Sequence, residues 1–171
     1  FQNIRLFKKM TVLDNVKVSF NYRVKYSLFD SILRTPKFKR EEEEINRKSI
    51  ELLKVFSLDV KKDELASNLP YGEQRKLEIV RALAAKPSLL LLDEPAAGMN
   101  PQETAELMDL INWIKEKYNL SILLIEHDMK LVMGICDKIA VLDYGKKIAE
   151  GTPDEIKNNP KVIEAYLGEG A

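Results

Sequence analysis

Two continuous aliphatic runs interrupt the amphipathic pattern of this chain. Leu89–Leu92 and Ser121–Ile125 have the length of strands, and runs of this kind predict strands that are buried on both faces of a parallel sheet. The segment between them predicts a helix, because apolar residues recur there at helical spacing: Leu107, Leu110, Ile111, Ile114 and Tyr118. The order strand, helix, strand predicts a βαβ unit and an α/β fold.

Polar side chains follow both predicted strands. Asp93 and Glu94 come directly after the first run, and Glu126 and His127 after the second. The carboxyl ends of parallel strands share one sheet edge, where α/β proteins bind their ligands. Asp93 suits a hydrated Mg²⁺, and Glu94 is placed to orient or deprotonate a water. The alternatives are a solvated acidic turn and, for the chain's single histidine, a structural role.

The segment 69–84 predicts a loop that feeds a helix. Pro70 and Gly72 punctuate it, and strong helix formers then continue to Ala85. A helix amino terminus suits a phosphate, and Arg75 and Lys76 add positive charge one turn further on. Taken alone, the same residues also fit an ordinary amphipathic helix.

A further helix start is predicted at Asn100, a good N-cap residue, with Pro101 in the first helical position and Glu103 completing a capping box. Upstream, the charge reversal at residues 37–44 predicts a helix that opens on Glu41–Glu44, whose acids favour the helix dipole.

The chain divides near Lys86-Pro87 into a mostly helical half and a half that alternates strand and helix. The second half also predicts a strand, a turn, a returning strand and two short helices, at residues 138–142, 143–146, 147–149, 153–157 and 161–167.

These elements together resemble the ATP-binding-cassette family. Residues 69–74 look like its signature loop, residues 89–94 like its Walker B strand with the catalytic glutamate, residues 96–100 like its D-loop, and His127 like its switch histidine. Gln2 would then end the Q-loop. The resemblance implies a partial P-loop NTPase (RecA-like) parallel sheet with an ABC-type α-helical subdomain. Residues 1–86 would hold the Q-loop end, the helical subdomain and the signature helix, and residues 87–171 the Walker B, D-loop and H-loop region with the C-terminal helices.

Within the family, the chain looks most like the ATP-binding subunit of branched-chain amino-acid importers. The opening run, a long insert at residues 20–40, Pro70-Tyr71-Gly72 and the tail at residues 160–169 carry this resemblance. It implies an ATPase subunit that powers import of branched-chain, hydrophobic amino acids from the cytoplasmic face of the membrane. It implies as partners a second ATP-binding subunit, identical or not, a membrane-embedded permease and, indirectly, a periplasmic or extracellular substrate-binding protein. The sequence leaves open which amino acid is carried.

The resemblance also assigns roles to single residues. Glu94 and His127 would be catalytic, and Asp93 and Gln2 would hold Mg²⁺. ATP would be bound by Gln2, Tyr71, Gly72, Glu73, Gln74, Gly98 and Asn100.

Three features depart from the family pattern. No G-x-x-x-x-G-K loop followed by Ser or Thr occurs in the chain, so we expect a carboxyl-terminal fragment of a full subunit that is inactive alone. Pro70 replaces the usual signature serine. Glu73 stands where glutamine is commoner, and its charge would oppose a γ-phosphate.

Composition narrows the alternatives. Basic and acidic residues number 27 each, so no global positive field favours nucleic acid. Cys136, the single cysteine, is expected to be a small apolar residue, and no apolar run has membrane-spanning length, so we expect a partner to supply any membrane role. Three alternatives remain: a lipopolysaccharide-export ATPase, which the insert at 20–40 disfavours; a soluble cassette ATPase acting on DNA or ribosomes; and a non-catalytic binding module.

Overall fold

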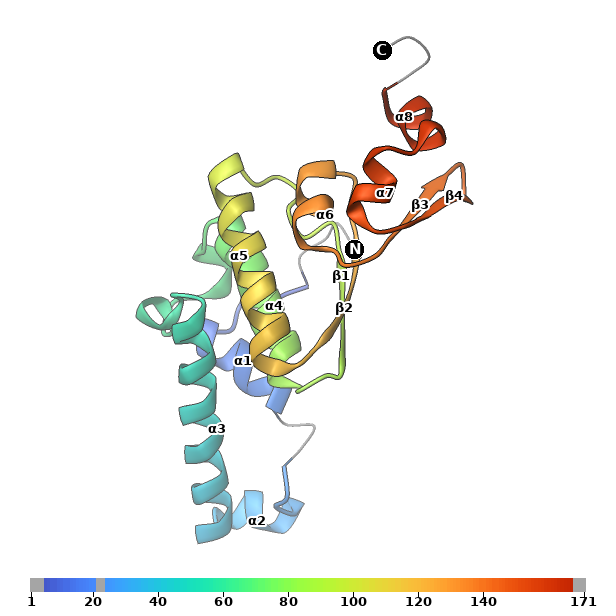
Figure 1. The fold of residues 1–171 in the computed structure, drawn as a ribbon. Coiled ribbons are helices and arrows are strands. Elements are labelled where there is room, and N and C mark those ends of the chain that lie inside the picture. The colour runs from blue at the N-terminus through green and yellow to red at the C-terminus, as the bar shows by residue number, and fades with distance from the viewer. Residues whose placement is uncertain (1–4, 21–23, 168–171) are drawn as a thin grey trace.

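The computed structural model describes residues 5–20 and 24–167, so the predicted role of Gln2 lies outside the described residues. The first half of the chain is helical (Figure 1). Its elements are α1 (Val12–Phe20), α2 (Leu28–Leu33), α3 (Pro36–Val55), the short 3-10 helices η2 (Asp59–Lys61) and η3 (Ala66–Asn68), and α4 (Tyr71–Ala84).

The second half alternates strands and helices, as the sequence predicts. Its elements are β1 (Leu89–Asp93), α5 (Pro101–Tyr118), β2 (Ser121–Ile125), α6 (Met129–Ile135), β3 (Ile139–Asp143), β4 (Lys146–Gly151), α7 (Pro153–Lys157) and α8 (Pro160–Leu167). Strands β1 and β2 pair in parallel, with Leu89 opposite Ser121 and Asp93 opposite Ile125. The βαβ unit and the mixed α/β fold are therefore confirmed. Strands β3 and β4 form a separate antiparallel pair.

The prediction that β1 and β2 are buried on both faces is wrong for the described structure. Leu90 and Leu92 are buried, but Leu91 is 66% exposed and, on the next strand, Leu123 is 57% exposed. The helices cover one face of this two-stranded sheet, and no described element covers the other. A run of leucines indicates that a strand suits an apolar environment on both sides, but it does not supply the covering elements.

The predicted start of α3 is also wrong. The helix begins at Pro36, and the Thr35 side chain caps it by accepting a hydrogen bond from the Phe38 backbone N–H. Glu41–Glu44 therefore lie beyond the first turn. Thr35-Pro36 is a stronger start signal than the change of charge, because proline is preorganised for the first helical position and its missing N–H costs nothing there.

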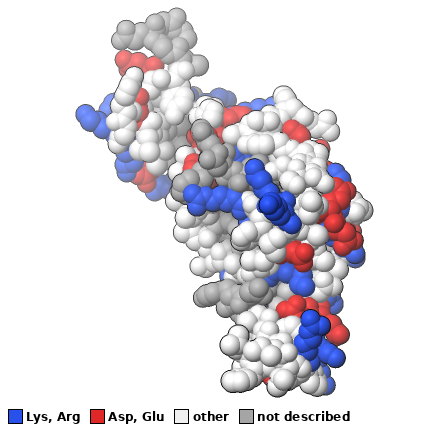
Figure 2. Space-filling view, turned by 180° about the vertical axis from the view of Figure 1, so that it is seen from behind, with Lys and Arg blue, Asp and Glu red and all other residues white. Residues whose placement is uncertain are grey.

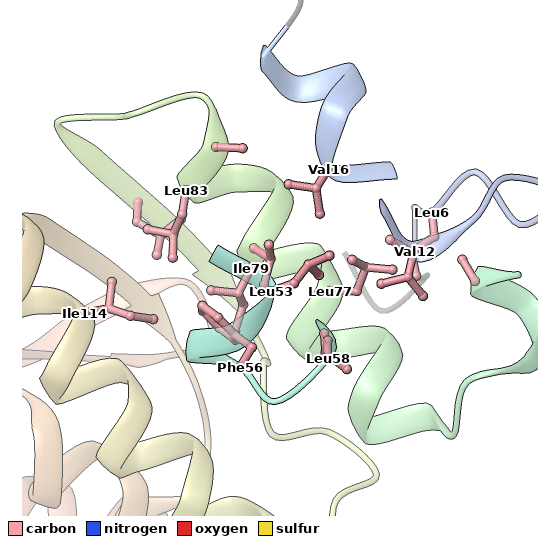
Figure 3. Close-up of a cluster of buried hydrophobic side chains, with 14 of the residues drawn as sticks. Leu6, Val12, Val16, Leu53, Phe56, Leu58, Leu77, Ile79, Leu83 and Ile114 are labelled. Carbon is pink, nitrogen blue, oxygen red and sulfur yellow. The ribbon is translucent and has the colours of Figure 1, made fainter. Parts of the chain in front are cut away.

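One apolar core joins the helical half to β1 and α5. Val12 and Val16 of α1, Leu53 of α3, Leu77 of α4 and Ile114 of α5 are all fully buried (Figure 3). Helix α4 therefore packs against α1 and α3 and shares one core with β1 and α5. A second, smaller cluster lies near the carboxyl end, formed by Val132, Ile139, Val141, Ile156 and Val162.

Cys136 is half-buried. Burial is the larger cause that raises the pKa of its thiol, and the neighbouring Asp137 carboxylate is the second, as expected for a packing residue. In the described residues, no helix combines the length and apolarity that crossing a bilayer requires.

Candidate functional site

The ends of β1 and β2 bring the predicted catalytic residues to one sheet edge. The Glu94 backbone N–H donates to the Ile125 carbonyl at 2.8 Å, extending the ladder by one residue past Asp93. The chain then turns sharply, because Glu94 has φ 45° and the Ala97 N–H donates back to its carbonyl at 3.1 Å. This turn lifts the Glu94 side chain out of the strand's alternation.

Glu94 and His127 are in contact across this edge. His127 Nδ1 lies 3.4 Å from Glu94 Oε1. The Glu94 side chain is 26% exposed and that of His127 is 73% exposed, so the pair is held by the sheet yet open to solvent. A carboxylate and an imidazole in this arrangement can together receive and orient a water or a phosphate oxygen.

Glu126 is a member of this site that the sequence interpretation does not select. Its side chain is only 2% exposed, and its Oε1 accepts from the Ala96 N–H at 3.1 Å. Its Oε2 accepts from the His127 backbone N–H at 3.2 Å and lies 3.9 Å from His127 Nδ1. The available signal is the alternation of β2, since Glu126 follows Ile122 and Leu124 on the inward face.

The signature loop forms a second group of predicted residues, at the start of α4. The Tyr71 hydroxyl accepts from Arg75 Nη2 at 3.0 Å, and the Arg75 guanidinium lies 5.4 Å from the centre of the same ring. Glu73 forms an ion pair with Lys61 at 2.7 Å, and Gln74 Nε2 donates to the Leu69 carbonyl at 2.8 Å. The Glu73 charge that we expect to oppose a phosphate is therefore balanced by a lysine.

The D-loop packs against the signature loop. Gly98 has φ 77°, and a Cβ at this position would lie 3.2 Å from Tyr71 Cε1. A Cβ on Gly72 would lie 3.1 Å from Glu103 Oε1. The positive φ of Gly98 favours glycine at that position, and the two close approaches bring together segments that are distant in the chain.

Asn100 caps α5 as predicted. Its side chain accepts from the backbone N–H groups of Gln102 and Glu103 at 3.0 and 2.9 Å, and Glu103 completes the capping box. Its side-chain oxygen is therefore already used within the chain.

The residues at the end of β1 suit a magnesium ion. Magnesium is usually held by one or two carboxylates together with waters and substrate phosphates, and Asp93 supplies such a carboxylate at the end of β1. Among the described residues, no group of three or more His, Cys, Asp and Glu side chains could hold a metal ion.

The fold and the arrangement of these residues are those of an ATP-binding cassette. A family model described as ABC transporter matches residues 1–97, more than half of the chain, and the chain therefore belongs to the ABC transporter family. A second model, described as branched-chain amino acid ATP-binding cassette transporter, matches residues 146–171.

Within the ABC transporter family, the chain is similar to ATP-binding proteins of branched-chain amino acid transport. The chain is 50% identical over 169 residues to the high-affinity branched-chain amino acid transport ATP-binding proteins LivG of Salmonella typhimurium and Escherichia coli, covering 99% of this chain. It is 45% identical to BraF of Pseudomonas aeruginosa, which bears the same description. The chain spans 66% of the length of each of these relatives.

A solved structure confirms the fold. MJ1267, an ATP-binding cassette of an ABC transporter, superposes with a TM-score of 0.77 at 31% identity, over 98% of this chain and 67% of that one. The same protein has been solved in an ADP conformation, which superposes with a TM-score of 0.74.

Proposed function

We propose that this chain belongs to an ATP-hydrolysing subunit that powers import of branched-chain amino acids. The contact between Glu94 and His127 carries the proposal, because a carboxylate and an imidazole 3.4 Å apart can act together on one water or phosphate. The likeness to the branched-chain transport proteins supports the substrate class.

Each residue has a chemical role in this proposal. Glu94 accepts a proton from the attacking water, and His127 donates a hydrogen bond to the γ-phosphate. Asp93 would hold Mg²⁺ together with Gln2, which lies outside the described residues, and the ion would neutralise phosphate charge. Tyr71, Gly72 and Gly98 shape the surface that faces a nucleotide held by a second ATP-binding subunit, at the amino terminus of α4.

The test is Glu94→Gln in the full-length subunit assembled with its partners. The substitution keeps the shape of the side chain and removes its charge, so we expect ATP binding to persist while hydrolysis falls by about 10²–10⁴. Phosphate release and nucleotide binding are measured in parallel. A Glu94→Gln protein with near wild-type turnover would exclude this carboxylate as the base.

Asp93→Asn is the matched comparison. It removes the neighbouring carboxylate charge, so it should raise the Mg²⁺ concentration needed for activity as well as lower the rate. If Asp93→Asn and Glu94→Gln gave the same magnesium dependence, the separate roles assigned to the two carboxylates would be wrong.

The partners and the division of the chain belong to the same proposal. We assign permease contact to residues 1–86, with Phe7, Met10 and residues 24–27 as its described surface, and nucleotide chemistry mainly to residues 87–171. Phe7 is 47% exposed and Met10 is half-buried, which supports an external surface.

Cysteine pairs test this assignment in membranes. One cysteine is placed at Phe7 or Met10 and the other in cytoplasmic permease loops, and disulfide cross-linking is followed. Cross-links that form only from residues after Pro101, and never from residues before Lys86, would contradict it.

A further inference from the structure

A short apolar helix lies at one end of the molecule. Helix α2 and the first turn of α3, residues 28–40, form what we call the tip (Figure 1). Four large apolar side chains of α2 stand in solvent: Leu28 and Phe29 are both 77% exposed, Ile32 is 69% exposed and Leu33 is 73% exposed. They form two pairs four residues apart, so they cover one continuous face of the helix.

The only acidic side chain of the tip does not contribute to this face. The Asp30 carboxylate accepts from the Ser27 backbone N–H and from the Thr35 hydroxyl, both at 2.9 Å. These hydrogen bonds to Ser27 and Thr35 lower the pKa of Asp30. The carboxylate is therefore occupied in fixing both ends of α2, and the helix presents its leucines, phenylalanine and isoleucine in a defined conformation.

Cations border the apolar face. Arg34, Lys37, Lys39 and Arg40 are all exposed, and within the described residues none of them forms an ion pair. At the lower end of Figure 2, basic side chains lie beside the uncharged surface of α2 and the start of α3. Four acidic residues, Glu41–Glu44, follow directly after Arg40 on α3, outside the tip.

We propose that the tip inserts its apolar face into the headgroup region of an anionic lipid bilayer. The face belongs to a single exposed helix of six residues. The four cations beside it match the negative surface potential of such a membrane. Apolar side chains flanked by Lys and Arg form the pattern of interfacial membrane contact. The proposal goes beyond the proposed function, because it gives the subunit a direct contact with lipid in addition to its permease.

Tryptophan fluorescence can locate the contact. The chain has one tryptophan, Trp113, so Trp113→Phe gives a silent background in which Phe29→Trp reports the tip alone. Vesicles of phosphatidylcholine with about a third phosphatidylglycerol are added, some with brominated acyl chains. We expect a blue shift and strong quenching at low salt, weakening at high salt, with little effect in pure phosphatidylcholine.

Two controls make the result specific. Leu123→Trp in the same background places the indole on the exposed face of the β1–β2 sheet, and it should not be quenched. In the Phe29→Trp background, Lys37→Gln with Arg40→Gln should lower the lipid partition coefficient, by about fivefold for each charge. Circular dichroism confirms that each variant keeps its helices.

Several outcomes would overturn the proposal. Absence of quenching at position 29, or equal quenching at position 123, would remove the specific lipid contact. A blue shift that depends on protein concentration without lipid would indicate a second copy of the chain. Cross-linking of the tip to permease loops without quenching by lipid would assign the surface to the permease. None of these results depends on ATP hydrolysis, so they leave the test of Glu94 separate.

Discussion

At the scale of single residues, the buried Glu126 carboxylate ties the two strand ends together. It accepts one hydrogen bond from the turn after β1, at Ala96, and one from the loop after β2, at His127. Because Glu94 and His127 are carried by these same two segments, Glu126 fixes how the proposed catalytic pair meets. Glu126 touches no reacting atom in this scheme and is a positioning residue.

Removing this clamp should destabilise the fold. Glu126→Ala leaves the Ala96 N–H without its partner in a half-buried turn, and such losses cost about 1–3 kcal/mol. Glu126→Gln keeps a carbonyl acceptor and should recover much of that stability. Urea unfolding of the variants measures the effect, with the exposed Glu116→Ala as control. Equal stabilities for Glu126→Ala and Glu116→Ala would contradict the clamp.

The sequence is informative about some of these residues and silent about others. Asp93, Glu94 and His127 can be selected because each closely follows an aliphatic run. Their meeting also depends on the register of β1 against β2, which two sequences of similar apolarity do not determine. The alternation of β2 places Glu126 on the inward face, but its partner, the Ala96 backbone N–H, cannot be identified from a residue pattern.

At the scale of elements, the start of α5 holds the D-loop in place. Asn100 caps the helix through two backbone N–H groups, and Glu103 of the same capping box is the residue that closely approaches Gly72 of α4. The cap thus belongs both to the stability of α5 and to the contact between D-loop and signature loop.

Asn100→Ala should therefore lower the free energy of unfolding by about 1 kcal/mol, the usual cost of losing an N-cap. Asn100→Asp, which preserves the capping oxygen, should be nearly neutral. Thermal unfolding followed by circular dichroism distinguishes them, with Gln102→Ala as a control in the first turn of the helix. An Asn100→Ala protein as stable as Asn100→Asp would show that the cap does not matter.

Element boundaries can be predicted where the capping chemistry is local. Asn100-Pro101 and the span of α7 match the expectation because the signals lie within four residues. The start of α3 is misplaced when the run of charges is weighted above Thr35-Pro36.

At the scale of the whole molecule, the proposed catalytic residues lie in a chain whose sequence contains no P-loop motif. Glu94 and His127 are both on the β1–β2 sheet, and no P-loop sequence occurs in the 171 residues. P-loop amides and lysine make most of the contacts to a triphosphate.

We expect the 171-residue chain to bind magnesium-ATP weakly and not to turn it over. Calorimetric titration with parallel phosphate release measures both. Micromolar affinity or steady turnover by this chain would mean that its described edge suffices for nucleotide binding. The same measurements on the Glu94→Gln variant of this chain show whether any weak turnover depends on the Glu94 carboxylate.

The exposed face of the sheet is the largest departure from expectation at this scale. Leu91 and Leu123 are of a residue type that is usually buried, yet they lie on the face of β1 and β2 that no described element covers. Sequence pattern reports what environment a strand tolerates, whereas burial depends on which elements pack against it. The burial of the inward face can be predicted, because Leu90 and Leu92 join a core formed with the neighbouring helices.

The backbone at Glu94 sets stability against chemistry at one position. In the folded protein, a non-glycine residue at φ 45° is strained by about 1–2 kcal/mol. Glycine would relieve this strain, and its greater freedom in the unfolded chain would cost only about 0.4–1 kcal/mol of stability. Glu94→Gly should thus slightly raise the free energy of unfolding while removing the carboxylate proposed as the general base. A screen that selects only for thermal stability would therefore favour this variant. Any library designed to stabilise this domain must keep glutamate at position 94.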